Sequence, residues 1–177
     1  KSPVVLQDVD MDVLPSKKDA ERVALVVFSS NSSLCGAFNA NVIRKFNETV
    51  SRLREHGYDL KDIDVFAVGK KAADAAVKAG FQLDEDFTDL ADKPSYDRAV
   101  DLASELIDRF SEGEVEQVIF IYSHMASTSS QPVIRENYLP LALHDYASGA
   151  YPEDYILEPD PMSLVKELLP KVLLLKM

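Results

Sequence analysis

Val23-Ala24-Leu25-Val26-Val27-Phe28 is an unbroken run of apolar residues, followed directly by Ser29 and Ser30. A run of this length suits a β-strand, and a strand that is apolar on both faces has to be covered on both faces, as in a parallel sheet. The run therefore predicts the central strand of an α/β sheet over residues 23–28.

The residues that follow alternate between helical and strand patterns. Apolar residues at helical spacing predict a helix, and Gly57 stands after it, at the position typical of a C-terminal glycine. The apolar residues of this first helix are Val42, Ile43, Phe46, Val50 and Leu53. Further along, the sequence predicts strands at 63–68 and 118–122, a helix at 71–79, and a helix that starts at Pro94-Ser95 and ends at Gly113. This order predicts an α/β fold with a Rossmann-like, mostly parallel sheet and flanking helices in a single domain.

The last third of the chain has a different pattern. An extended stretch at 133–141 is expected to add an edge to the sheet, and a mixed loop is expected at 142–152. A short strand is expected at 155–157, followed by a helix that begins at Pro159-Asp160-Pro161. Pro170 should interrupt that helix, because proline lacks an N–H and clashes with the preceding turn.

The predicted organisation has three parts. Residues 1–22 form a lead-in from a truncated N-terminal helix or linker, residues 23–160 form the central α/β domain, and residues 161–177 start a truncated C-terminal helix. The apolar end of the sequence, Val172 to Met177, contains no helix stop signal, so a fragment of a longer protein is expected.

Composition excludes several classes of function. The 177 residues include 19 Lys and Arg against 30 Asp and Glu, so the net charge is −11. This excess of negative charge argues against binding to nucleic acid or to anionic lipid. The single cysteine excludes an internal disulfide. No apolar run approaches the roughly 20 residues of a membrane-spanning helix.

Nucleotide-binding loops are missing from the expected places. Gly69-Lys70 is followed by Lys71, whereas a P-loop requires Ser or Thr at that position. The dinucleotide fingerprint GxGxxG is also missing after the first strand, because residues 29–38 contain one glycine, Gly36. We therefore expect no nucleotide or other cofactor.

The potential nucleophiles and metal ligands form no catalytic pattern. Cys35 lies at the start of the first predicted helix, where aligned N–H groups favour a thiolate. It is either a nucleophile or, more commonly for a free cysteine, a buried thiol. The serine-rich stretches at 29–33 and 127–130 lack the G-x-S-x-G motif. The acidic stretch at 84–92 lacks the pattern of a calcium loop and is interpreted as a solvated loop. The histidines His56, His124 and His144 have no metal-ligand spacing. The sequence thus predicts no catalytic residue and no metal site.

Three segments, in order, resemble the γ subunit of the F-type ATP synthase. Residues 29–39 (SSNSSLCGAFN) are similar to that family's strand followed by a "GLCGG-x-N" turn. Residues 121–141 resemble its "N-T-x-[ST]-Q-x-P … LLPL" stretch, and residues 155–161 (YILEPDP) resemble its "Y-x-x-EPDP" motif. The three motifs span about residues 23 to 170.

The sequence also departs from that family. Ser33 and Ala37 replace its glycines, and Asn31-Ser32 replaces its Asp-Arg pair. The second segment is one residue shorter around Ser127, and Pro170 stands where the family continues its helix. The family's two long terminal helices, which form a coiled-coil shaft, are almost wholly missing from this sequence.

The resemblance implies a non-catalytic rotor subunit that transmits torque between a membrane ring and a catalytic head. The implied partners are the α/β catalytic head, the ε subunit and the c-ring. The implied location is the cytoplasmic face of the bacterial inner membrane, held there through the complex and without insertion of the chain itself.

Two surfaces are the expected interfaces of such a rotor. The first is the turn that contains Leu34, Cys35, Gly36 and Asn39, which is expected to face the catalytic β subunits or to line the neck of the shaft. The second is the 142–155 loop, in which Tyr146, Tyr151 and Tyr155 either contact the c-ring or merely cover the sheet edge.

An alternative function belongs to a different class. The chain could be a stand-alone α/β enzyme or small-ligand binder that uses a crevice at the carboxyl ends of its strands, lined by Ser29, Cys35 and Ser123.

Overall fold

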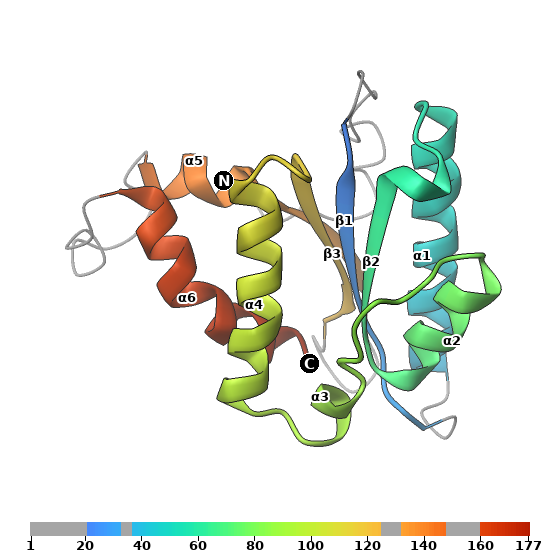
Figure 1. Ribbon diagram of the computed structural model, residues 1–177. Helices are drawn as coiled ribbons and strands as arrows, with labels where there is room; N and C mark the ends of the chain where they lie inside the picture. Colours follow the sequence, from blue (N-terminus) through green and yellow to red (C-terminus); the bar gives the residue numbers. More distant parts are fainter. Residues whose placement is uncertain (1–20, 33–36, 125–131, 148–159) are drawn as a thin grey trace.

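A single four-stranded sheet organises the molecule in the computed structural model, which describes residues 21–32, 37–124, 132–147 and 160–177 (Figure 1). The strands are β1 (Val23–Phe28), β2 (Ile63–Val68), β3 (Gln117–Ser123) and β4 (Val133–Leu139). Their order is β2-β1-β3-β4. β1 pairs in parallel with both neighbours, and β4 joins β3 in antiparallel orientation at the edge. The predicted Rossmann-like, mostly parallel sheet is confirmed.

Helices lie on both faces of this sheet. They are α1 (Ala37–Glu55), α2 (Lys70–Lys78), α3 (Asp89–Asp92), α4 (Tyr96–Ser111), α5 (Leu141–Ala147) and α6 (Pro161–Lys176), with a short 3-10 turn at Leu60–Asp62. α1 and α2 cover one face, whereas α4 and α6 cover the other (Figure 1).

The sheet separates two hydrophobic cores, one on each face, and β1 supplies residues to both. No residue of β1 is more than 2% exposed. Ala24, Val26 and Phe28 belong to the core under α4 and α6. The other half of the strand (Val23, Leu25 and Val27) belongs to the core under α1 and α2. Successive side chains of β1 enter opposite cores, so every residue of the strand has to be apolar. This is the burial on both faces that the sequence predicts.

The prediction that Pro170 interrupts the last helix is wrong. α6 continues through Pro170 to Lys176. A proline inside a helix costs about 3 kcal/mol, because it removes one hydrogen bond and crowds the preceding turn. The apolar side chains Leu169 and Leu173 on either side of Pro170 are fully buried, and each such burial contributes roughly 1.5–3 kcal/mol. Packing of α6 therefore offsets the local cost of the proline.

Two further expectations need correction. Residues 141–147 form the helix α5, where a mixed loop was expected from residue 142, and Leu143 and His144 donate their N–H groups to the carbonyl of Pro140. The acidic stretch, expected to be a solvated loop, contains the short helix α3. The strand expected at 155–157 lies outside the described residues.

Gly69 joins β2 to α2 in a conformation that other residues rarely adopt. Its φ is +116°, and a Cβ atom added there would lie 2.2 Å from the carbonyl oxygen of Ser29. The close approach brings the start of α2 against the end of β1. Only glycine fits at this junction.

The first prediction concerns the part of α6 after Pro170. Leu173→Ala should lower the free energy of unfolding by about 2–4 kcal/mol, because it removes a side chain with no exposed surface and leaves a cavity. The matched control is Leu175→Ala on the same turn, where the side chain is 84% exposed and the change should stay within about 0.5 kcal/mol. Equal effects of the two variants in urea denaturation would contradict the continuous, packed helix.

The second prediction concerns Gly69. Gly69→Ala should destabilise the chain by about 3 kcal/mol or more, because the added Cβ is both strained and overlapped by backbone. Gly113 has φ +80° but no atom within 4 Å of an added Cβ, so Gly113→Ala should cost only about 1–2 kcal/mol. Thermal unfolding of both variants tests this, and a harmless Gly69→Ala would show that the junction is looser than described.

Candidate functional site

The carboxyl end of β1 is a candidate ligand site, because open α/β sheets bind ligands beyond the carboxyl ends of their strands. Here β1 ends at Phe28, and the turn Ser29-Ser30-Asn31 follows it. This turn lies beside the N-terminus of α2, which follows Gly69. In many nucleotide-binding proteins, the free N–H groups at such a helix start hold a phosphate.

The chain's own oxygen atoms already occupy this helix start. The N–H of Ala72 donates to the hydroxyl of Ser29 over 2.8 Å, and the N–H of Lys71 donates to the carbonyl of Ser30 over 3.2 Å. The N–H of Lys70 donates to the side-chain oxygen of Asn31. These are the donors that an incoming phosphate would use. The turn therefore engages the donors at the start of α2.

Ser29 is fixed in this structural role. It is 7% exposed, and its hydroxyl donates to the carbonyl of Ser30 over 3.0 Å while it accepts from Ala72. Its own N–H donates to the carbonyl of Val68 over 2.8 Å. A serine nucleophile needs an adjacent base to take its proton, whereas this hydroxyl is bonded to a backbone carbonyl and a backbone amide. Ser29 thus joins β1, β2 and α2 rather than lining an open site.

Asn39, one of the predicted interface residues, holds the same turn from α1. Its side-chain oxygen accepts from the N–H of Ser30 over 3.0 Å. Its amide nitrogen donates to the hydroxyl of Ser30 over 2.8 Å and to the carbonyl of Ser32 over 2.9 Å. The side chain is buried, so Asn39 shapes the turn from within. A contact between this turn and another subunit stays a prediction.

Most of the other predicted site residues are not described by the structure. Leu34, Cys35 and Gly36 lie outside the described residues, as do Tyr151 and Tyr155. Tyr146 belongs to α5, and Ser123 is the half-buried last residue of β3. Across the described ranges, no group of three or more His, Cys, Asp or Glu side chains is placed to hold a metal ion.

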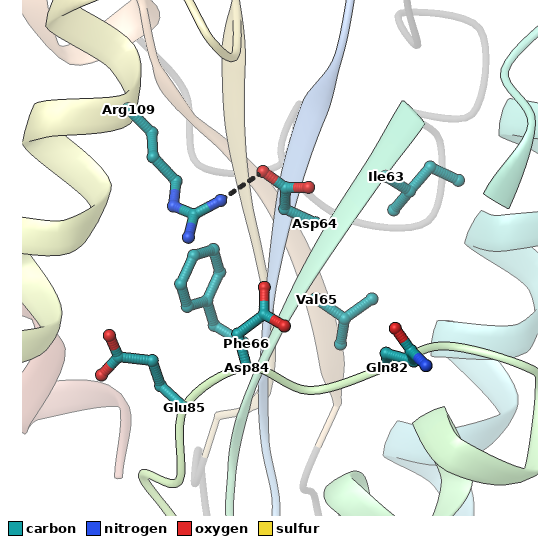
Figure 2. A pocket seen from close by; sticks show the side chains of 8 residues that line it. All are labelled: Ile63, Asp64, Val65, Phe66, Gln82, Asp84, Glu85 and Arg109. Atoms are coloured by element: carbon teal, nitrogen blue, oxygen red, sulfur yellow. Dashed lines mark hydrogen bonds and ion pairs between the residues drawn. The ribbon is translucent and has the colours of Figure 1, made fainter. Parts of the chain in front are cut away.

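The outer edge of β2 carries a charged cluster that the sequence analysis missed. Asp64 accepts from Arg109 of α4 over 2.8 Å (Figure 2). It also pairs with Arg22. Arg109 bonds Glu105 as well, and its guanidinium lies 5.2 Å from the centre of the Phe66 ring. Asp64 is more than 40 residues from both arginines in sequence, so no local pattern reveals the cluster. The cluster fastens α4 and the start of β1 to the sheet edge.

The cavity beside this cluster is too small for a nucleotide. Its volume is about 50 Å³, and Figure 2 shows its lining side chains. Ligand pockets usually measure about 300–1,000 Å³, whereas a few waters fit in a space of this size. The lining residues are Ile63, Asp64, Val65, Phe66, Gln82, Asp84, Glu85 and Arg109. The cavity is best explained as solvent around an ion pair.

A larger groove lies between α2 and the segment before α3, with a volume of about 440 Å³. Its lining includes the carboxylates of Asp74, Asp84, Glu85 and Asp86, and its one lysine, Lys70, pairs with Asp74 over 3.3 Å. The pKa of Asp86 is lowered because the hydroxyl and the N–H of Thr88 donate to its carboxylate, which keeps it charged. A groove with this charge repels phosphate groups.

Arg98 orders the acidic stretch that forms one wall of this groove. It bonds Asp89 over 3.0 Å and Asp101 over 3.1 Å, and it donates to the carbonyl of Asp86. Its guanidinium also lies 4.7 Å from the centre of the Phe87 ring. The contacts with Arg98 lower the pKa of Asp89, chiefly through the hydrogen bond. The stretch is thus a structured part of the domain surface.

None of the helices within the described ranges is long and apolar enough to cross a membrane.

A family model and individual relatives that match this chain all belong to ATP synthases. A family model described as "ATP synthase" matches residues 4–177. The ATP synthase gamma chain of Bacteroides fragilis is 45% identical over 161 residues, which are 89% of this chain and 55% of that protein. The gamma chain of Phocaeicola vulgatus is 42% identical over 165 residues, which are 91% of this chain and 56% of that protein.

A solved structure gives a weaker likeness. A chain from the central stalk and c-ring of the Tetrahymena thermophila mitochondrial ATP synthase is 18% identical, with a TM-score of 0.49, over 92% of this chain and 75% of that one. This likeness adds nothing to the assignment, which depends on the sequence matches.

The present chain spans about half the length of the curated relatives that it matches. The family match nevertheless covers nearly all of its 177 residues. The chain therefore belongs to the ATP synthase family that this model describes, and within that family its sequence matches gamma chains.

Proposed function

We propose that this chain is the central α/β body of a rotor subunit in an F-type ATP synthase, where it transmits torque between a membrane ring and a catalytic head. The observation that carries the proposal is the match of residues 4–177 to the family model, together with relatives that are named gamma chains. The proposed role is mechanical, and the chemistry of ATP belongs to other subunits.

The occupied start of α2 supports a non-catalytic role. Ser29, Ser30 and Asn31 bond the N–H groups there, so this helix start has those donors engaged by the chain itself. The two cavities described above are either too small or too acidic for a nucleotide. These observations also weigh against the alternative of a stand-alone enzyme that uses Ser29, Cys35 and Ser123.

The packing of the domain suits a rotor part that must resist deformation under torque. Each coupling ion that crosses the membrane delivers roughly 2.3 kcal/mol per 100 mV, and a body that deformed under load would lose that energy. Close-packed interiors have low compressibility and transmit strain. A sheet packed on both faces, with charged contacts at its edge, is such an interior.

The proposed partners are the α/β catalytic head, the ε subunit and the c-ring. We place the subunit at the cytoplasmic face of the bacterial inner membrane, held there through the complex. The turn with Leu34, Cys35, Gly36 and Asn39 is the proposed contact toward the head. Tyr146, Tyr151 and Tyr155 supply the proposed contact toward the c-ring, where tyrosines add amphipathic area.

Purification of the assembled complex tests this function. The parent protein that carries this segment, tagged and extracted from membranes of its own bacterium, should bring the head subunits, ε and c with it. The complex should hydrolyse ATP, whereas the parent protein produced alone should not, because the proposal assigns the chemistry of ATP to other subunits. The same tag on an unrelated cytosolic protein is the control. Recovery of the parent protein without these subunits, or turnover of a substrate by the parent protein alone, would refute the proposal.

A further inference from the structure

Lys176, at the end of α6, makes three contacts with the sheet. Its Nζ atom lies 3.0 Å from a carboxylate oxygen of Glu136 on β4. The same atom donates to the hydroxyl of Tyr122 on β3 over 3.1 Å, and it lies 4.2 Å from the centre of that ring. The Tyr122 hydroxyl in turn donates to Glu136 over 3.1 Å, which closes a triangle of polar contacts.

Water is largely excluded from this triangle. The side chains of Lys176 and Glu136 are 16% and 18% exposed, and Tyr122 is buried. Burial, and then the charge of Glu136, raises the pKa of Tyr122, so its hydroxyl stays protonated and donates to the carboxylate. Interactions of charged groups that are partly removed from water are stronger and less screened by salt than those at the surface.

The rest of α6 is held mainly by apolar packing, through Leu164, Val165, Leu169 and Leu173. The hydrophobic effect is non-directional, whereas an ion pair with hydrogen bonds fixes the position of one side chain relative to another. Pro170 also removes one hydrogen bond of the helix, and it therefore weakens the connection between the first and last turns of α6. A directional contact beyond Pro170 compensates both for the non-directional packing and for the hydrogen bond lost at Pro170.

We propose that Lys176, with Glu136 and Tyr122, is a clamp that positions the part of α6 after Pro170 on the β3–β4 pair. Under the proposed rotor function, on which this inference depends, the clamp passes twist applied at α6 into the sheet instead of allowing the helix to slip or to bend at Pro170. Lys176 is a positioning residue, and neither it nor its two partners touches a substrate.

The opposite edge of the sheet offers a matched control. There Asp64 on β2 fastens Arg109 of α4 through a partly buried ion pair of the same kind. The ion pairs and ring contact of Asp64 and Arg109 join β2, α4 and Arg22, so Asp64→Asn removes a comparable contact and leaves the three contacts of Lys176 in place.

The experiment uses the assembled complex with the variants Lys176→Met, which keeps the length of the stem, and Glu136→Gln, which keeps the shape of the acceptor. Two measurements are made on each: hydrogen exchange at residues 171–176, and the number of ions pumped per ATP hydrolysed. Both variants should exchange roughly tenfold faster at these residues, because the contact that opposes local opening is gone. Both should also pump fewer ions per ATP than the wild type, while hydrolysis by the catalytic head continues.

Two further variants complete the test. Lys176→Arg should restore the exchange and the pumping, because it keeps the charge beside Glu136 and over the Tyr122 ring. Asp64→Asn should lower the free energy of unfolding but leave the ions pumped per ATP unchanged. Normal pumping by Lys176→Met and Glu136→Gln in a complex that assembles would overturn the clamp, as would an equal loss in Asp64→Asn. A wild-type protein that fails to join the complex would instead refute the proposed function.

Discussion

Burial of β1 on both faces is the constraint from which the rest of the structure follows. Six consecutive apolar side chains cannot face water on either side, and each that is buried contributes roughly 1.5–3 kcal/mol. Layers of helix are therefore required on both faces of the sheet, and α1 with α2 and α4 with α6 supply them. The parallel pairing with β2 and β3 follows from the crossover helices that build these layers.

The same architecture brings the turn after β1 against the start of α2. In a nucleotide-binding relative of this architecture, the start of the helix after a strand is left free for phosphate. Here Ser29, Ser30 and Asn31 take up those donors, and Gly69 allows the close approach that makes the contacts possible. These hydrogen bonds connect β1, β2 and α2. The polar groups that hold a phosphate in a nucleotide-binding protein bond to the chain itself here.

The sequence predicted those elements whose signal is local. The strands predicted at 23–28 and 63–68 coincide with β1 and β2, and Ser95 caps α4 as expected because its hydroxyl accepts from the backbone N–H of Arg98. Local rules failed where tertiary packing decided the outcome, as at Pro170, whose helix continues because the residues around it are buried. The partners of Asp64 and Lys176 are far apart in sequence, so a pattern of spacing could not identify them. Most of the predicted interface residues lie outside the described ranges, and their roles stay predictions.

Rotation of this body relative to the catalytic head is the most direct measurement of the central claim. Tyr96, at the start of α4, is 49% exposed and provides a place for a probe. In a complex fixed to a surface through its head, with Cys35→Ser to remove the thiol of this segment, a bead attached at Tyr96→Cys should turn steadily in one direction when ATP is added. A bead that keeps its orientation while the same complex hydrolyses ATP would contradict the account.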